Sequence, residues 1–287
     1  MPTELHKFRR LVLGLQLSAP DPAIRLAVEL AELLDLDLLG LFLEDASLRD
    51  LAGIPFAREF RLLGGGWHSL DLDRLVHDLE VAARGMERTF TQAVKTLSKR
   101  SQFEVMRGPV AEAITSISNS GDIVMIVEPT SAAERVSGQF SWLVQAAFRS
   151  VAAVMLVPSR IIRTKGPIVA VAMSGDDPTI AAAAAIAVAA KETLIVIGPG
   201  GWDRETPRIT QLAAKTGLTI QQFTAGALSF DPTACLKAMG DLQERLVVMT
   251  RLPFDGATAF AIVTARQVPV LIIEPERLPP GEGDSRT

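Results

Sequence analysis

Residues 12–24 read VLGLQLSAPDPAI, and residues 168–180 repeat this pattern, without a gap, as IVAVAMSGDDPTI. In both stretches a mainly apolar run leads to a serine, and an Asp-Pro pair follows. Aspartate is a favoured N-cap residue and proline suits the first helical position, so each stretch predicts a strand followed by a helix. The repetition predicts two tandem copies of one fold.

The ends of the two copies also match. GDIVMIVEP (121–129) is similar to ERLVVMTRLP (244–253), and AAVMLVP (152–158) is similar to VPVLIIEP (268–275). Runs of Val, Ile and Leu without alternation suit strands covered on both faces, and their alternation with helices indicates parallel βαβ units. We therefore expect an α/β protein, in which each copy has a mostly parallel five-stranded sheet with helices on both faces.

The charged stretch SRIIRTKGP (159–167), which ends in Gly-Pro, is the expected boundary between the copies. This gives a first domain over residues 1–160, a shorter second domain over 166–275 and a flexible tail over 276–287. The first domain carries an inserted segment, 45–70, which has no counterpart in the second domain.

Helical spacing of apolar residues predicts a long amphipathic helix within residues 71–98. The residues expected to pack on the first domain are Leu75, Leu79, Met86 and Phe90. Residues 45–68 should be less regular, and the Gly64–Gly66 run should form a flexible break before the helix.

Composition excludes several function classes. The net charge is −4 and no long basic run exists, so we expect no nucleic-acid partner. The longest apolar stretch, IAAAAAIAVAA, is shorter than the roughly 20 residues of a membrane span, and the N-terminal residues do not resemble a secretory signal. We therefore expect a cytoplasmic protein without a membrane partner. With one cysteine, Cys235, and histidines only at His6, His68 and His77, no metal site is expected.

The order, spacing and repetition of these motifs resemble the universal stress protein family in its tandem form. GDIVMIV (121–127) is similar to the family's D-x-[IV]-[VI]-M-G strand, and PVLII (269–273) matches its final P-V-L-V-V. The resemblance implies that the last strands of the two copies, Val154–Val157 and Val270–Ile273, pair antiparallel and form an intramolecular pseudo-dimer.

The resemblance also indicates where ATP-binding members hold their ligand. An aspartate two residues before a serine ends their first strand; here Gln16 precedes Ser18, and Ala172 precedes Ser174. Their phosphate loop reads G-x2-G-x9-G-[ST]. In the first copy its positions fall, in order, on Val127, Thr130, Phe140 and Ser141, and only the hydroxyl of Ser141 is kept.

The departures from the motif disfavour phosphate binding. Glycine in such loops allows positive φ and lets backbone amides reach the phosphate, whereas Val127 is β-branched and Phe140 would fill the space. In the second copy the first glycine position falls on Thr250, and the loop is shorter by about seven residues. We therefore expect no ATP or AMP cofactor. A nucleotide that did bind would lie near Gln16, Ser18, Thr130 and Ser141.

These features predict a non-enzymatic, stress-associated or regulatory protein, since no nucleophile–base pair is visible in the sequence. The alternative is a binder of a nucleotide or another small molecule in a remodelled pocket of the first half. GIPFAREF (53–60) could then be a lid, or it could contact a protein partner or a second copy. Its aromatic residues could also simply pack onto the domain.

Overall fold

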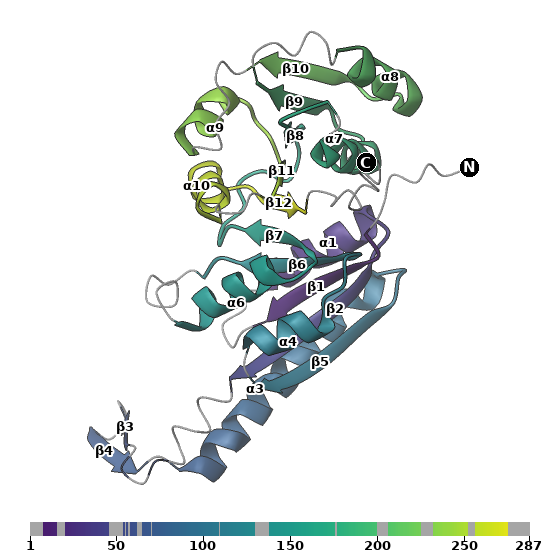
Figure 1. Cartoon of the computed structure of the whole chain (residues 1–287). Helices are drawn as coiled ribbons and strands as arrows, with labels where there is room; N and C mark the ends of the chain where they lie inside the picture. Colours follow the sequence, from purple (N-terminus) through teal and green to yellow (C-terminus); the bar gives the residue numbers. More distant parts are fainter. Residues whose placement is uncertain are drawn as a thin grey trace, which may run out of the picture. The chain divides into compact units, whose positions relative to one another are not determined.

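The computed structural model describes residues 8–15, 21–45, 54, 56, 58–61, 65–69, 71–108, 110–129, 138–175, 177–199, 206–224, 232–251 and 256–274. They form two compact units, a first unit over Phe8–Ala152 and a second unit from Ala153 onward. Each unit is a sheet with helices packed against it, so the predicted α/β architecture is confirmed (Figure 1).

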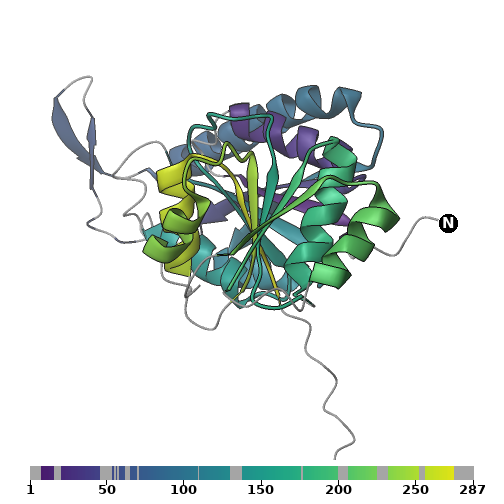
Figure 2. The ribbon, with the colours of Figure 1, turned by 90° about the horizontal axis from the view of Figure 1, so that it is seen from above.

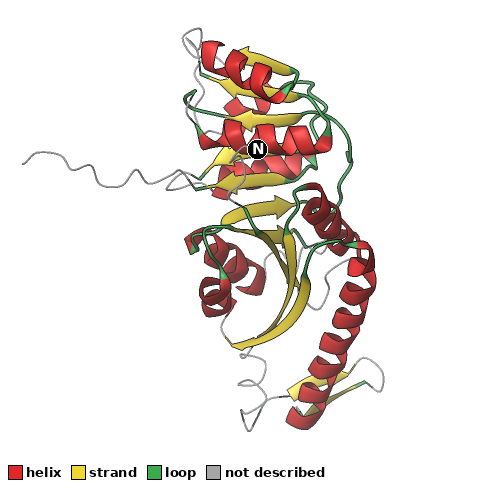
Figure 3. Ribbon diagram, turned by 90° about the vertical axis from the view of Figure 1, so that its right-hand side faces the viewer, coloured by secondary structure: helices red, strands yellow, loops and turns green. Residues whose placement is uncertain are grey.

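The first unit has four parallel strands in the order β6-β1-β2-β5. Helices α1 and α3 pack beside each other on one face, and α4 and α6 pack beside each other on the opposite face (Figure 3). The bounds are β1 Arg10–Leu15, β2 Asp37–Asp45, β5 Ser101–Gly108, β6 Asp122–Val127, α1 Asp21–Leu33, α3 Leu72–Ala93, α4 Val110–Ile117 and α6 Gly138–Arg149, with a 3-10 turn at Val94–Thr96.

The second unit has six strands in the order β10-β9-β8-β11-β12-β7. Helices α7 and α8 (green) lie on one side of the strands, and α9 and α10 (yellow-green) lie on the other (Figure 2). The bounds are β7 Ala153–Val157, β8 Ile168–Val171, β9 Leu194–Gly198, β10 Ile220–Thr224, β11 Leu246–Thr250, β12 Val270–Ile273, α7 Pro178–Ala190, α8 Thr206–Thr216, α9 Pro232–Met239 and α10 Gly256–Arg266.

Strand β7 pairs antiparallel with β12, with Met155 opposite Leu271, while the other pairs of this sheet are parallel. The predicted pairing of the last strands of the two copies is therefore confirmed. Because of this pairing, the division between the compact units falls before β7, at Ala152, and not within 159–167.

The charged stretch 159–167 is tied to the second unit. The Ile162 amide donates to the Gln267 carbonyl at 3.3 Å, and the Gly166 amide donates to a Glu192 carboxylate oxygen at 3.2 Å. Gly166 has φ +128°, and a Cβ there would lie 2.2 Å from the Gln243 carbonyl oxygen. Only glycine fits this position, which explains why the stretch ends in Gly-Pro.

The predicted long helix is present as α3. Asp71 caps it by accepting a hydrogen bond from the Arg74 amide at 3.2 Å. Leu79 and Phe90 are buried and the other two predicted contact residues are half-buried. The Phe90 ring lies directly over Gly40 of β2, where a Cβ would come within 2.7 Å of Phe90 Cε2.

Part of the inserted segment is more regular than expected. Arg58–Arg61 (β3) and Gly66–Ser69 (β4) form an antiparallel ribbon, which lies away from the sheet near the N-terminal end of α3 (Figures 1 and 3). Gly65 has φ +55° and Gly66 begins β4, so these two glycines belong to the ribbon, while Gly64 lies outside the described residues.

The apolar side chains of this ribbon and of the residues before it face solvent. Phe60 and Trp67 stand opposite each other, with ring centroids 5.4 Å apart, and are 53% and 66% exposed. Ile54 and Phe56 are also exposed. The interpretation that the aromatic residues of GIPFAREF pack onto the domain is therefore wrong.

Candidate functional site

The carboxyl ends of parallel strands are the usual place for ligands in α/β sheets, and the predicted site residues follow such ends. In the first unit β1 and β6 are neighbours and end at Leu15 and Val127. Gln16, Ser18 and Thr130 come directly after or near these ends, but they lie outside the described residues. Whether they form a site with Ser141 therefore stays a prediction.

The first turns of α6 are described from Gly138 onward. Ser141 is exposed, and its hydroxyl accepts a hydrogen bond from Gln145 Nε2 at 3.4 Å. Phe140 is buried, and Leu143 lies against β1, where its Cδ2 would be 3.6 Å from a Cβ on Gly14. The start of α6 is thus held by apolar packing against the domain.

The equivalent region of the second unit is described in more detail. Asp177 caps α7, and its buried carboxylate accepts four hydrogen bonds. Its Oδ2 accepts from the Met173 amide at 2.9 Å, and its Oδ1 accepts from the amide and the hydroxyl of Thr179 at 3.0 and 2.8 Å. The hydroxyl of Thr250, the last residue of β11, also donates to Oδ1 at 2.8 Å.

This arrangement limits the chemistry of the site. A helix N-terminus favours an anion, and here the chain's own carboxylate holds that position. A carboxylate that already accepts several hydrogen bonds within the fold is a cap rather than a general base. The family's aspartate position in this unit is Ala172, which is fully buried and donates its amide to the Ile197 carbonyl at 3.0 Å.

The sheet register compares the fourth strands of the two copies directly. In the first unit Met125 of β6 pairs with Leu13 of β1, and in the second unit Val247 of β11 pairs with Val169 of β8. Because Leu13 and Val169 are equivalent positions of the repeat, Met125 is equivalent to Val247. Three residues further along, Glu128 therefore matches Thr250, whereas the sequence comparison had matched Thr250 with Val127. The Thr250 hydroxyl, which belongs to the hydrogen-bond network of Asp177, therefore stands where the first unit has the buried carboxylate of Glu128.

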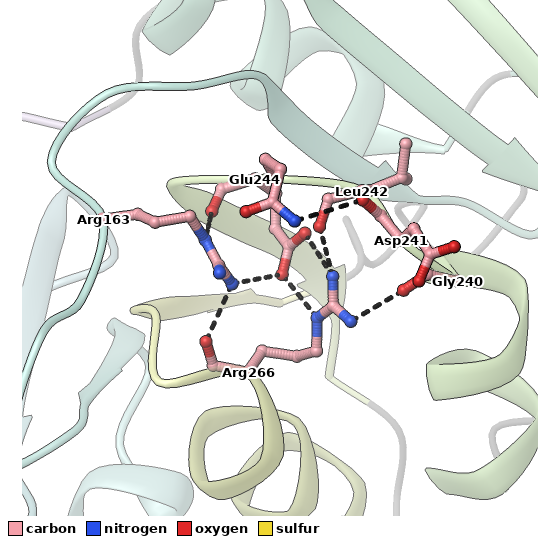
Figure 4. A network of polar contacts seen from close by, with 7 residues as sticks. Arg163, Gly240, Asp241, Leu242, Glu244 and Arg266 are labelled. Atoms are coloured by element: carbon pink, nitrogen blue, oxygen red, sulfur yellow. Dashed lines mark hydrogen bonds and ion pairs between the residues drawn. The ribbon is translucent and has the colours of Figure 1, made fainter.

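Each unit also has an arginine–carboxylate cluster at the amino side of its fourth strand. In the first unit Arg10 donates to both carboxylate oxygens of Asp122 at 3.2 and 2.6 Å, and this hydrogen bonding raises the pKa of Arg10. In the second unit the fully buried Glu244 accepts from Arg266 at 2.7 and 2.8 Å and from Arg163 at 3.4 Å (Figure 4).

The Glu244 cluster fastens several loops rather than forming an open site. Arg163 also donates to the backbone carbonyls of Glu244 and Arg266, and Arg266 donates to those of Gly240 and Leu242 (Figure 4). The hydrogen bond to Glu244 raises the pKa of Arg266. Arg163 comes from the charged stretch 159–167, so this stretch is anchored through its arginine.

Arg251 is another poorly exposed arginine that no motif in the sequence marks as a site residue. Arg251 follows β11 and forms an ion pair with Glu274 at 2.6 Å, while its amide donates to the Ile273 carbonyl. Burial lowers the pKa of Arg251, and the charge of Glu274 partly counters this effect. The pair joins the carboxyl ends of β11 and β12.

The first unit contains a pocket of about 250 Å³ between α3 and strands β2 and β5. Glu44, at the end of β2, is buried there and accepts from Arg107 Nε of β5 at 3.0 Å. This pair could not be recognised in the sequence because its residues are 63 positions apart and lie near the ends of two different strands. The lining residues are Glu44, Glu80, Ala83, Arg84, Glu87, Val105 and Arg107.

The other candidates carry no visible chemistry. Cys235 is buried in α9, as a lone thiol usually is, while His68 and His77 are exposed and His6 lies outside the described residues. Within the described ranges, no group of three His, Cys, Asp or Glu residues could hold a metal ion.

Asp177 is a helix cap, as expected. No helix in the described part of the chain is long and apolar enough to cross a membrane.

Comparison with known proteins identifies the fold. No protein-family model matches the chain, and no curated protein matches it in sequence. A universal stress protein from Archaeoglobus fulgidus DSM 4304 matches in structure with a TM-score of 0.65 at 13% identity, over 95% of this chain and 98% of that one. A putative universal stress protein from Pseudomonas aeruginosa UCBPP-PA14 matches with a TM-score of 0.53 at 16% identity, over 94% and 95%.

A similar fold also occurs as one domain of a transport protein. The cytoplasmic domain of a prokaryotic cation chloride cotransporter matches with a TM-score of 0.50 at 9% identity, over 92% of this chain and 95% of that one. At such low sequence identities a structural match shows the fold, and function has to be argued from the residues of the site. Over almost its whole length, the chain has the fold of the universal stress proteins.

Proposed function

We propose that the chain is a non-enzymatic, stress-associated regulatory protein of the universal stress protein type whose nucleotide sites are lost. The observation that carries this proposal is the closed hydrogen-bond network of Asp177. Its carboxylate already provides the anion at the N-terminus of α7, and Thr250 completes its hydrogen bonding. A nucleotide bound across the carboxyl ends of β8 and β11 would have this buried, negatively charged carboxylate beside it.

The proposal extends to the first unit on sequence grounds. Gln16 replaces the nucleoside-contacting aspartate, and the loop glycine positions read Val127, Thr130 and Phe140. The burial of Phe140 supports a loop end that is packed with side chains. The absence of catalytic activity is proposed because the sequence contains no recognisable nucleophile–base pair.

The proposal includes a cytoplasmic location and action through protein contacts, without nucleic-acid or membrane partners. The two halves would form an intramolecular pseudo-dimer, and the antiparallel pairing of β7 with β12 supports this. The exposed aromatic side chains of Phe56, Phe60 and Trp67 support a contact with a protein partner or a second copy, because such side chains gain from burial.

A second candidate function is small-molecule binding in the first unit. The pocket that contains Glu44 and Arg107 favours it, since it lies near the carboxyl ends of two parallel strands. Its lining does not include Ser141, the described member of the predicted site. A ligand here would therefore use a different part of the unit from the family's nucleotide.

One experiment separates these functions. The purified chain is denatured and the released small molecules are identified by mass spectrometry, while the folded chain is titrated calorimetrically with Mg-ATP. We expect no nucleotide in either measurement. A co-purified nucleotide, or a low-micromolar dissociation constant for Mg-ATP, would overturn the main proposal, whereas another retained small molecule would favour the second candidate.

A further inference from the structure

We propose that the pocket between α3 and strands β2 and β5 binds a small zwitterion of the α-amino acid class. This inference rests on the second candidate function, small-molecule binding in the first unit. The volume of about 250 Å³ is larger than the roughly 150 Å³ of a cavity that holds the six carbon atoms of benzene. The pocket therefore suits a ligand of about eight non-hydrogen atoms, which is the size of a small amino acid and far below that of a nucleotide.

The anion-binding group of the pocket is Arg107. Its Nε donates to the buried carboxylate of Glu44, which fixes the plane of the guanidinium. In the part of the chain that the structure describes, no hydrogen bond engages its two Nη groups, and its side chain is 58% exposed. A guanidinium held through Nε can present both Nη groups to one carboxylate, the geometry in which arginine recognises carboxylates best.

The cation-binding group comes from α3. Glu80, Arg84 and Glu87 lie on one face of this helix at helical spacing, and all three line the pocket. Arg84 is directed to Glu80, with its Nε donating to the Glu80 carbonyl at 3.3 Å and its Nη2 lying 3.9 Å from the carboxylate. Among the described residues no ion pair engages Glu87, so its carboxylate remains for a ligand ammonium.

Charge and surface select the ligand class further. The pocket has three carboxylates and two guanidiniums, a net charge of −1, so a polyanion is disfavoured. A zwitterion adds no net charge, and it satisfies one group of each sign. Ala83 and Val105 provide the apolar part of the lining, against which a small aliphatic side chain can pack.

The test uses the full chain and the individual L-amino acids as probes. Thermal-shift measurements on the whole set are followed by calorimetric titration of those that stabilise the protein. For each hit, the corresponding amine, which lacks the carboxylate, and the N-acetyl derivative, which lacks the charge of the ammonium, are titrated in parallel. We expect both to bind at least about tenfold more weakly, because each loses one charge-assisted interaction.

Three variants complete the test. Glu87→Gln should weaken binding by about ten- to a hundredfold, and Arg107→Lys should do the same while keeping a positive charge beside Glu44. Arg88→Gln, at the exposed neighbouring position outside the pocket, should leave affinity unchanged. The melting temperature of each variant shows whether it folds.

The inference is overturned if no amino acid binds with a dissociation constant below about 1 mM, or if the amine or the N-acetyl derivative binds as tightly as the parent. It is also overturned if a folded Glu87→Gln protein binds normally. Failure of the second candidate function looks different, since no small molecule of any class would then be retained. Binding of Mg-ATP, measured on the same sample, reports separately on the main proposal.

Discussion

The Thr250 hydroxyl donates to Oδ1 of Asp177 over 2.8 Å and joins the end of β11 to the start of α7. The two residues are 73 positions apart, and both are 8% exposed. The bond lies between β8 and β11, the first and fourth strands of the second copy, whose carboxyl ends are where the family resemblance predicts a nucleotide. Among the described residues, this bond directly joins the end of the fourth strand to the helix that follows the first strand.

Replacing Thr250 with valine should destabilise the protein by about 1–3 kcal/mol, because a buried charged acceptor loses one donor at nearly constant side-chain volume. Thr250→Ser, which keeps the hydroxyl, is the matched control and should retain the bond. Urea denaturation followed by circular dichroism measures both. Equal stability of the valine variant and the parent would show that the hydroxyl has no structural role.

The contact of Phe90 with Gly40 gives a second prediction. Gly40→Ala should cost about 1–3 kcal/mol, since its Cβ would lie 2.7 Å from the ring and the packing must shift. Phe90→Ala alone should cost about 3–5 kcal/mol. In the Phe90→Ala background the alanine at position 40 should cost almost nothing, and an undiminished cost there would contradict the steric explanation.

Helix α3 shows what the sequence could predict. Apolar spacing over several turns predicted the helix and its buried residues Leu79 and Phe90, because a packed face requires this periodicity. Repeated local patterns predicted two tandem copies, and the family resemblance implied the pairing of their last strands, which β7 and β12 form. Gly40 could not be explained in this way, since its need for a missing Cβ depends on a ring that is 50 residues away.

The cluster of Glu244 with two arginines gives a third prediction. Glu244→Gln should cost about 3–5 kcal/mol, because it removes the charge that compensates two poorly exposed guanidiniums. Glu32→Gln, at an exposed position outside the cluster, is the control and should change stability by less than about 0.5 kcal/mol. Urea denaturation measures the difference, and a cost for Glu244→Gln no larger than that of the control would contradict the structural role.

The pH dependence of this cluster follows from Arg266. Its pKa is raised in the folded state, so the stability that its charge contributes is fully present below the ordinary arginine pKa. That stability is lost only as the pH rises through the raised folded value. The positive charge of Arg266 should therefore contribute the same amount to the free energy of unfolding at about pH 6 and at about pH 9. A fall in the cost of Glu244→Gln at the higher pH would have to come from another group.

The candidate sites were harder to predict than the fold. The Asp177 cap was visible because an Asp-Pro pair is a local helix-start signal. Its partner Thr250, and the pair of Glu44 with Arg107, depend on which strands become neighbours in the sheet. Their residues lie at strand ends that look ordinary in the sequence. Only the strand order and register bring them together.

The exposed ribbon gives a fourth prediction. Phe60→Ser should leave the unfolding midpoint of the chain nearly unchanged, within about 0.5 kcal/mol, because the side chain is 53% exposed and faces solvent. Phe90→Ala, an aromatic truncation in the core of the same unit, is the matched comparison. A large loss of stability in Phe60→Ser would mean that the ribbon is part of the core of the unit.

The last prediction concerns ATP. Gln16 and Ala172 stand at the positions where the family resemblance predicts a nucleoside-contacting aspartate, and losing one charge-assisted hydrogen bond costs roughly 1.5–3 kcal/mol. Loss of backbone amide contacts to the phosphates should cost at least as much again. A total of about 4–6 kcal/mol corresponds to a thousandfold or more, which would turn micromolar affinity into millimolar.

We therefore expect no heat of Mg-ATP binding at micromolar concentrations and no hydrolysis above background. The variant Asp177→Asn makes the test more stringent, because it removes the negative charge from the N-terminus of α7 while keeping a capping side chain. If this charge alone excluded phosphate, the variant would gain measurable affinity. We expect it to remain without ATP binding, since Ala172 still lacks the aspartate carboxylate and the shortened loop still lacks its amide donors.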